Sequence, residues 1–293
     1  MEIPSLPPQQ NTRTFRHVLT VIAREPLSLA STIAIILFIF VALFAYQIAP
    51  YPLEGAGKTN VSNSMLPPSW QHPMGVDKLG RDILSRVIIG SQPALIIPIG
   101  VVLFAVLLGA PLGALAGYKG GWLDEVIMRI TDLFLAFPSL LLAMAIASAL
   151  GRGLDKAAFA LVISWWPWYT RLVRGVTLSL KERYFVEAAQ AMGVRDAMII
   201  LRHILPNTIS PILVQASVDL GTVILAMGGL AFLGLGTQPP SPDWGLMVSE
   251  GRTYILTQWW IATFPGIAIF VVVLAFNLLG DTLRDIFDPR QYK

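Results

Sequence analysis

Long, nearly uncharged apolar stretches constrain this sequence more than any other feature. The first runs from Leu27 to Ala49 without a single charged residue, and five further apolar stretches follow it. A helix that crosses the hydrocarbon core of a bilayer needs about 20 predominantly apolar residues. Only 13% of the 293 residues are charged, whereas soluble domains carry roughly 25%, so a water-soluble fold could not cover its surface. The sequence therefore predicts an all-α membrane protein with six transmembrane helices.

The polar segments between these stretches divide the chain. In order, we expect a cytoplasmic tail at 1–26, a first transmembrane helix at 27–49, an external loop at 50–87, a core domain with five transmembrane helices at 88–282, and a cytoplasmic tail at 283–293. The core spans are predicted at 88–117, 126–150, 157–176, 207–235 and 258–279. The loop 236–257 contains Pro239, Pro240 and Pro242, which exclude a continuous helix there.

The placement of Lys and Arg predicts the orientation. Six spans put both chain ends on one side of the membrane. Fourteen Lys and Arg residues fall on that side, which also holds the long polar loop 177–206, and seven fall on the other. Because cytoplasmic loops carry an excess of Lys and Arg, we expect both termini and the 177–206 loop in the cytoplasm. The 50–87 and 236–257 loops then face outward.

The second span contains Gly109, Gly113 and Gly117, a small residue at every fourth position. This spacing puts all three on one helix face, where a neighbouring backbone can approach closely. Prolines also occur inside several spans, Pro138 in the third among them. Kinked helices suit a path lined by water or by other helices; the alternative is that prolines are ordinary in membrane helices.

The loop 177–206 predicts a helix-turn-helix. Residues 181–192 are good helix formers, and Gly193 can adopt the positive φ that ends such a helix. Asp196 is a candidate N-cap for a second short helix at 197–205, and Pro206 favours a fresh helix start into the fifth span. The alanine-rich face of this hairpin could be approached closely by another protein.

This segment resembles the EAA loop of ABC importer permeases. The motif positions are occupied by Glu187, Ala188, Ala189, Gly193, Leu205 and Pro206. His203 stands where the family has isoleucine, and Ile204 follows it. In that family the loop forms a coupling helix in a groove of the ATPase subunit, so the resemblance implies that these six residues dock on an ATPase. The alternative is a solvated linker between two spans.

Three further segments resemble the dipeptide, oligopeptide and nickel permease group within that family. They are residues 75–86, 232–245 and 277–290, and together they indicate the C-type member of the permease pair. Two departures are Val76, where the group has threonine, and Ala226-Met227, where many relatives carry an acidic residue.

The resemblance implies a type I ABC importer permease fold in the cytoplasmic (inner) membrane, with peptides as cargo. Nickel chelates and oligosaccharides are the alternatives. It also implies a homologous second permease, one or two ATPase subunits that hold ATP and magnesium, and an extracellular or periplasmic substrate-binding protein. No nucleic-acid partner is implied.

Three charged residues of the predicted external loop, Asp77, Arg81 and Asp82, can be explained by local pairing and helix capping. Asp77 and Arg81 are four residues apart and could pair on one exposed helical face. Asp82 could cap the helix that enters the second span. We favour loop order and helix capping over a direct functional role for these residues.

Ionisable residues inside spans are functional candidates by default. Asp132 is expected to pair with Arg129 at the membrane interface. Asp219 lies in the fifth span with Gln215 one turn earlier, and it could either line a translocation path or bond a neighbouring helix. Trp165 and Trp168, early in the fourth span, could line the path or belong to an interfacial aromatic belt.

The sequence shows no catalytic constellation. It has no cysteine, and its histidines, His17, His72 and His203, are scattered over separate regions, so we expect neither a metal site nor an enzyme. Gly57-Lys58-Thr59 lacks the first glycine of a phosphate-binding loop, which puts ATP binding in another subunit. Two rival classes are an ion-coupled secondary transporter, which needs ionisable groups at the midplane, and an intramembrane enzyme.

Overall fold

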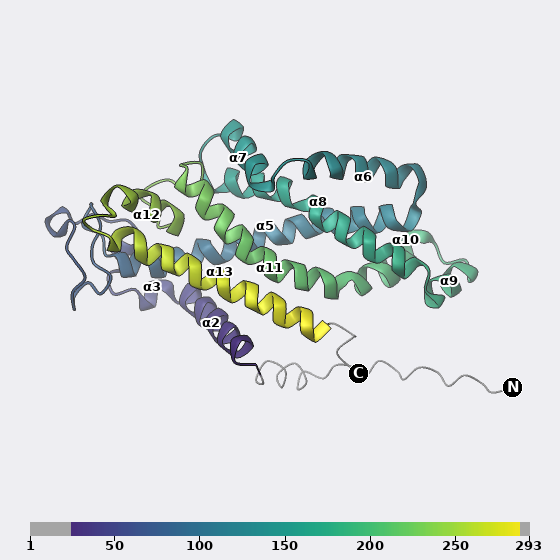
Figure 1. Cartoon of the computed structure of the whole chain (residues 1–293), viewed down its shortest axis with the longest axis horizontal. Coiled ribbons are helices and arrows are strands. Elements are labelled where there is room, and N and C mark those ends of the chain that lie inside the picture. The colour runs from purple at the N-terminus through teal and green to yellow at the C-terminus, as the bar shows by residue number, and fades with distance from the viewer. Residues whose placement is uncertain (1–24, 288–293) are drawn as a thin grey trace.

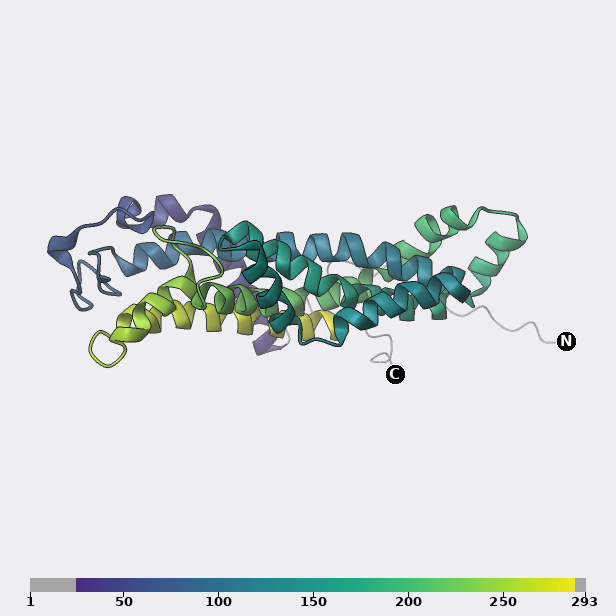
Figure 2. The same ribbon diagram turned by 90° about the horizontal axis from the view of Figure 1, so that it is seen from above.

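The computed structural model describes residues 25–287, which form an elongated bundle of helices (Figures 1 and 2). Within these residues, the secondary structure is helical apart from one isolated bridge between Val76 and Asp82. Most of each predicted tail, 1–26 and 283–293, lies outside the described residues.

The long helices in chain order are α2 (Pro26–Leu43), α5 (Ile83–Lys119), α6 (Gly121–Leu135), α7 (Ser139–Leu150), α8 (Leu154–Lys181), α11 (Leu205–Phe232) and α13 (Trp260–Phe287). Shorter helices are α3 (Ala45–Ile48), α4 (Pro52–Gly55), α9 (Tyr184–Ala191), α10 (Asp196–Ile199) and α12 (Trp244–Gly251). Single turns form η1 (Val61–Asn63), the π-helical η2 (Ile200–Ile204) and η3 (Arg252–Tyr254).

Four continuous helical segments are long and apolar enough to cross a membrane. They are Pro26–Leu43, Ile83–Lys119, Asp196–Phe232 and Trp260–Ile286, and the bent pair α6–α7 makes a fifth. Large apolar side chains such as Phe104, Leu107 and Phe270 are exposed on the outside of the bundle. An exposed apolar surface of this extent suits contact with lipid.

The predicted span at 126–150 is broken into two helices, α6 and α7. The chain bends by 84° between α6 and α7, across Ala136, Phe137 and Pro138. Proline disfavours the helical conformation in the residue before it and has no N–H to donate. The break therefore falls where the sequence has a proline.

The glycine stripe of α5 faces α8, as its spacing predicts. A Cβ on Gly113 would overlap the carbonyl oxygen of Thr170, and one on Gly117 would lie 2.9 Å from the carbonyl oxygen of Arg174. The backbones of α5 and α8 thus touch where only glycine leaves room.

The loops that the sequence predicts to be external and the loop that it predicts to be cytoplasmic lie at opposite ends of the bundle (Figure 1). The loop 50–82 and α12 share one end, whereas α9 and α10 project from the other. The start of α2 and the last turns of α13 are tied together by a 2.8 Å hydrogen bond from the Thr282 hydroxyl to the Ser28 hydroxyl. The two ends of the described chain therefore leave the bundle next to each other.

Candidate functional site

The α9–α10 hairpin presents most of the predicted docking residues at its surface. Glu187, Ala188, Gly193 and Pro206 are exposed and Leu205 is half-buried, whereas Ala189 is buried against the rest of the chain. The hairpin extends beyond the ends of the long helices (Figures 1 and 2), so a partner can reach it without disturbing the bundle.

Gly193 ends α9 as predicted. It has φ +75°, and its N–H donates to the Gln190 carbonyl at 2.9 Å while the Val194 N–H donates to the Ala189 carbonyl at 3.1 Å. Glycine adopts this left-handed conformation without the penalty that a Cβ imposes. The turn between α9 and α10 is therefore defined by this one residue.

The second half of the hairpin differs from the prediction in two ways. Arg195, not Asp196, is the N-cap of α10, and the Asp196 carboxylate instead accepts from the Tyr118 hydroxyl at 3.1 Å and the Lys119 ammonium at 2.5 Å. Helix α10 also runs through the π-helical turn η2 into α11 without a break. Pro206 has no N–H to donate within this helix, and the wider turn lies directly before it.

The hairpin is packed firmly on the bundle. Val186, Ala189, Ile199 and Ile204 are buried in one cluster with residues of α5 and α8. The Gln190 amide also donates to the Tyr118 hydroxyl on α5 at 3.1 Å. Interiors packed in this way transmit displacement rather than absorb it.

Apolar side chains remain uncovered on the outer face of the same hairpin. Tyr184 is 89% exposed, and Met192 is 76% exposed. Together with the exposed Glu187 they form a surface that combines apolar anchors with one acidic group. Exposed apolar patches with a polar neighbour are typical of protein interaction sites.

Asp219 bonds a neighbouring helix. Its carboxylate accepts hydrogen bonds from the Tyr169 hydroxyl of α8 at 2.7 Å and from the Gln215 amide one turn earlier at 3.1 Å. Asp219 and Tyr169 are both buried in the bundle. A buried carboxylate with two donors is a satisfied structural group.

The other candidate path residues differ in exposure and surroundings. Trp165 is buried, whereas Trp168 is 47% exposed and donates to the Ser139 hydroxyl at 3.3 Å. Gln215 lines a cavity of about 640 Å³ between α8, α11 and α13. The Trp165 side chain also hydrogen-bonds the Asp219 carboxylate, so the structure brings Gln215, Asp219 and Trp165 together and leaves Trp168 apart.

Asp132 has a different partner from the one expected. Its carboxylate accepts from the Arg171 guanidinium of α8 at 2.6 Å, while Arg129 pairs weakly with Glu125 at 3.8 Å. A second ion pair of the same kind, Asp124 with Arg174, is bidentate at 2.5 and 2.7 Å. Two ion pairs therefore hold α6 against α8.

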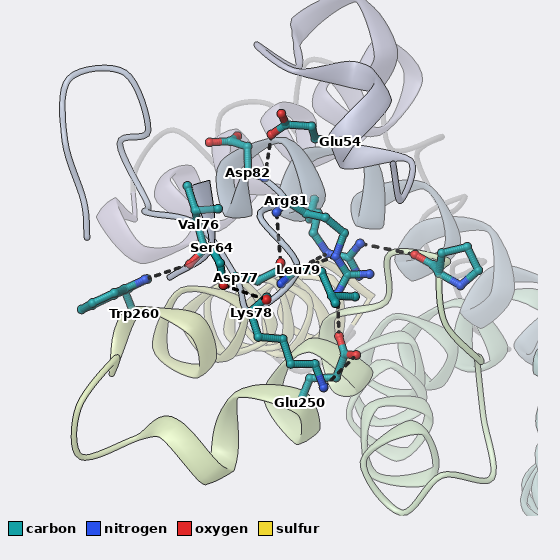
Figure 3. Close-up of polar contacts among 12 residues, drawn as sticks. Glu54, Ser64, Val76, Asp77, Lys78, Leu79, Arg81, Asp82, Glu250 and Trp260 are labelled. Atoms are coloured by element: carbon teal, nitrogen blue, oxygen red, sulfur yellow. Dashed lines mark hydrogen bonds and ion pairs between the residues drawn. The ribbon is translucent and has the colours of Figure 1, made fainter. Parts of the chain in front are cut away.

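A buried ionic cluster organises the end of the bundle that carries the 50–82 loop (Figure 3). Arg81 donates to Asp77 at 2.6 Å and to Glu250 of α12 at 3.1 Å. Asp77 also accepts from the backbone N–H groups of Leu79 and Arg81. The expected pairing of Asp77 with Arg81 is confirmed, but it lies in a buried turn of the loop before α5 and not on a helical face.

Asp82 caps α5 as predicted. Its carboxylate accepts from the Ser85 N–H at 2.8 Å and from the Ser85 hydroxyl at 2.7 Å. The other carboxylate oxygen lies 2.8 Å from Nδ1 of His72, and Glu54 accepts from the Asp82 N–H at 3.1 Å. These contacts fix the entry of the chain into α5.

Asp243 plays the same capping part at α12. Its side chain accepts from the Leu246 N–H at 2.9 Å and from the Thr237 hydroxyl at 3.2 Å. Burial raises the pKa of the Asp243 carboxyl above its usual range, because the charged form loses its hydration.

Within residues 25–287 there is no cluster of His, Cys, Asp or Glu that could hold a metal ion.

Comparison with known proteins decides the family. Residues 109–293 match the family described as "Binding-protein-dependent transport system inner membrane component". This chain belongs to that family. It is therefore an inner-membrane permease subunit of an ABC importer, and ATP binding resides in a partner ATPase. The alternatives of a secondary transporter and of an intramembrane enzyme are wrong.

Full-length relatives agree with this assignment, and a solved structure shares the fold. The glutathione transport system permease protein GsiD of Escherichia coli O6:K15:H31 is 44% identical over 98% of this chain and 94% of its own length. The dipeptide transport system permease protein DppC of Alkalihalophilus pseudofirmus is 42% identical over 98% and 95%. A chain of the inward-facing MetNI methionine ABC transporter matches the fold with TM-score 0.56 at 19% identity, over 69% of this permease and 96% of that chain.

Proposed function

We propose that this permease pairs with a homologous second permease to form a path for short peptides, di- or oligopeptides, into the cytoplasm. The cargo is supported by the relatives named for dipeptide and glutathione transport, which align over almost the whole chain. The coupling is supported by one structural observation. This is the projecting α9–α10 hairpin, whose exposed motif residues lie on a base packed into α5 and α8.

The proposed topology has six transmembrane helices, with α8 as the additional span. Helix α8 is 28 residues long, or about 42 Å at 1.5 Å per residue, which exceeds the roughly 30 Å hydrocarbon core. It is less apolar than the other spans because it contains Arg171 and Arg174, and both of these charges are paired with carboxylates of α6. Six spans return the chain to its starting side, in keeping with the hydrogen bond between the start of α2 and the last turns of α13.

In this topology both termini and the hairpin are cytoplasmic, and the 50–82 loop and α12 are external. ATP binding closes the ATPase subunits around ATP and magnesium. The hairpin surface at Glu187, Ala188 and Gly193 then moves with them. The uninterrupted helix from Asp196 to Phe232 carries this displacement into the membrane, where it bears the Asp219–Tyr169 bond to α8.

The external end is the proposed docking surface for the substrate-binding protein. The cluster of Asp77, Arg81 and Glu250 joins the 50–82 loop to α12, so both external segments form one continuous surface. Asp82 contributes by fixing the start of α5 below that surface.

Uptake by the complete complex tests the proposed cargo. The two permeases and the ATPases are reconstituted in vesicles with the binding protein, and entry of a labelled dipeptide is followed with and without ATP. We expect ATP-dependent entry that unlabelled peptides suppress. Suppression by nickel chelates or oligosaccharides instead of peptides would contradict the proposal.

A further inference from the structure

Gly280, Asp281 and Arg284 belong to the C-terminal segment 277–290, which resembles that of the family, and they line a cavity. The cavity measures about 640 Å³ and lies between α8, α11 and α13. Cavities of roughly 300–1,000 Å³ hold small organic ligands. Its wall is lined by Leu172, Ser210, Pro211, Val214, Gln215, Val218, Gly280, Asp281 and Arg284.

Two opposite charges stand on one wall of this cavity. Asp281 and Arg284 are three residues apart on α13, so both face the same side of the helix. Their side chains are exposed, and among residues 25–287 no ion pair or hydrogen bond joins either of them to a partner. A carboxylate and a guanidinium are thus both free to meet a ligand in the same space.

Helix electrostatics do not account for this pair. The C-terminal end of a helix carries partial negative charge, which favours a cation such as Arg284 in the last turns of α13. This field falls off within the last turn, so it neither favours nor explains the carboxylate of Asp281 one turn earlier, which is unpaired within residues 25–287. A ligand that carries a positive group supplies the missing partner.

We propose that the cavity is an exit site for a zwitterionic peptide, with Arg284 receiving its carboxylate and Asp281 its ammonium group. The amide of Gln215 and the hydroxyl of Ser210 meet the peptide backbone. An extended chain advances about 3.3–3.6 Å per residue, so the ends of a dipeptide are about 7 Å apart. Side chains at i and i+3 emerge about 5–6 Å apart, which suits that separation.

The location matches an exit rather than an entrance. The cavity lies along the N-terminal half of α11 and the C-terminal turns of α13, towards the end of the bundle that bears the α9–α10 hairpin (Figure 1). The proposal rests on the function proposed above, because it requires peptides as cargo and a cytoplasmic hairpin.

The test compares blocked and free peptides in the reconstituted complex. Uptake is measured for a free dipeptide, its N-acetylated form and its C-amidated form, with Asp281→Asn and Arg284→Gln as separate variants. Asp281→Asn should lower the ratio of uptake of the free dipeptide to uptake of its N-acetylated form. Arg284→Gln should lower the ratio of uptake of the free dipeptide to uptake of its C-amidated form. Each ratio should change about two- to fivefold, as for a partly exposed charge pair.

Glu125→Gln and Arg129→Gln are matched controls, because they remove another exposed pair of opposite charges, on α6. They should leave both ratios at the wild-type value. If Asp281→Asn and Arg284→Gln slow all three peptides equally, or leave both ratios unchanged, the exit site is refuted. If the wild-type complex carries no peptide at all, the proposed cargo itself fails, which is a separate outcome.

Discussion

Asp219 shows how a single polar residue is stabilised inside this bundle. Its donors come from α8 and from its own helix, and the Tyr169 side chain that faces it is fully buried. Removing one member of such a pair leaves the other unsatisfied, whereas removing both is far less costly.

We therefore expect Asp219→Ala to lower the stability of the complex by about 1–3 kcal/mol, and the double variant with Tyr169→Phe to be less damaged than the sum of the two. Thermal unfolding in detergent measures both effects. Thr222→Ala, on an exposed part of the same helix, is the control and should change little. Simple additivity of Asp219→Ala and Tyr169→Phe would show that the bond carries no energy.

Gly193 is the residue on which the hairpin geometry depends. Gly193→Pro forces φ to about −65° at a position that has φ +75°, and it removes the N–H that bonds Gln190. We expect normal insertion of the complex with ATP-driven peptide uptake reduced at least about tenfold, because a mispositioned contact can cost two orders of magnitude.

Gly175→Ala is the matched control for that variant. Gly175 lies inside α8 with no atom near an added Cβ and without positive φ, so alanine should be neutral or slightly stabilising there. Full uptake by Gly193→Pro would count against the coupling role of the hairpin.

Sequence reasoning succeeded for residues whose chemistry is local. The Gly193 turn and the Asp82 cap each depend on neighbours within a few positions. The partners of Asp132 and Arg81 were missed because Arg171 and Glu250 lie far away in the chain, and no local spacing reveals them. The charge of Asp219 was visible, but its burial against Tyr169 was not.

At the scale of elements, the contact between α5 and α8 organises the bundle. It depends on the glycine stripe, since a Cβ on Gly113 would overlap the α8 backbone. The sequence predicted the close approach but not which helix would make it. Likewise it contained Pro138, yet the sharp bend between α6 and α7 depends on how both halves pack.

We expect Gly113→Leu to force α5 and α8 apart and to lower stability by about 3 kcal/mol or more, because backbone cannot give way as a side chain can. The yield of assembled complex and its unfolding temperature report the change. Gly100→Leu is the control on the same helix, since nothing lies near an added Cβ there. Equal tolerance of both variants would show that the α5–α8 contact is not tight.

For the whole molecule, the family and the all-helical membrane architecture were predictable from apolar stretches and motif spacing. The continuity of α10, η2 and α11 was not, because Pro206 in the sequence favours a fresh start. That continuity makes the hairpin and a transmembrane helix one mechanical unit, and it supports the proposed transmission of force.

The orientation of the whole permease can be read with reporters. A phosphatase that is active only outside should be active when fused after residue 60 and inactive after residue 190, whereas a fluorescent protein that folds in the cytoplasm should give the opposite pattern. The excess of Lys and Arg near the hairpin is the reason. Reversed signals would overturn the proposed topology.

Contact between the hairpin and an ATPase subunit is the central claim, and the absence of cysteine from the 293 residues permits a direct measurement. Ala188→Cys places one reactive thiol on the exposed side of α9, and Ala189→Cys places one on its buried side. In the assembled complex, a short thiol-to-amine cross-linker should join Ala188→Cys to the ATPase subunit and leave Ala189→Cys unlinked. Failure of Ala188→Cys to cross-link, in a complex that still imports peptide, would contradict the account.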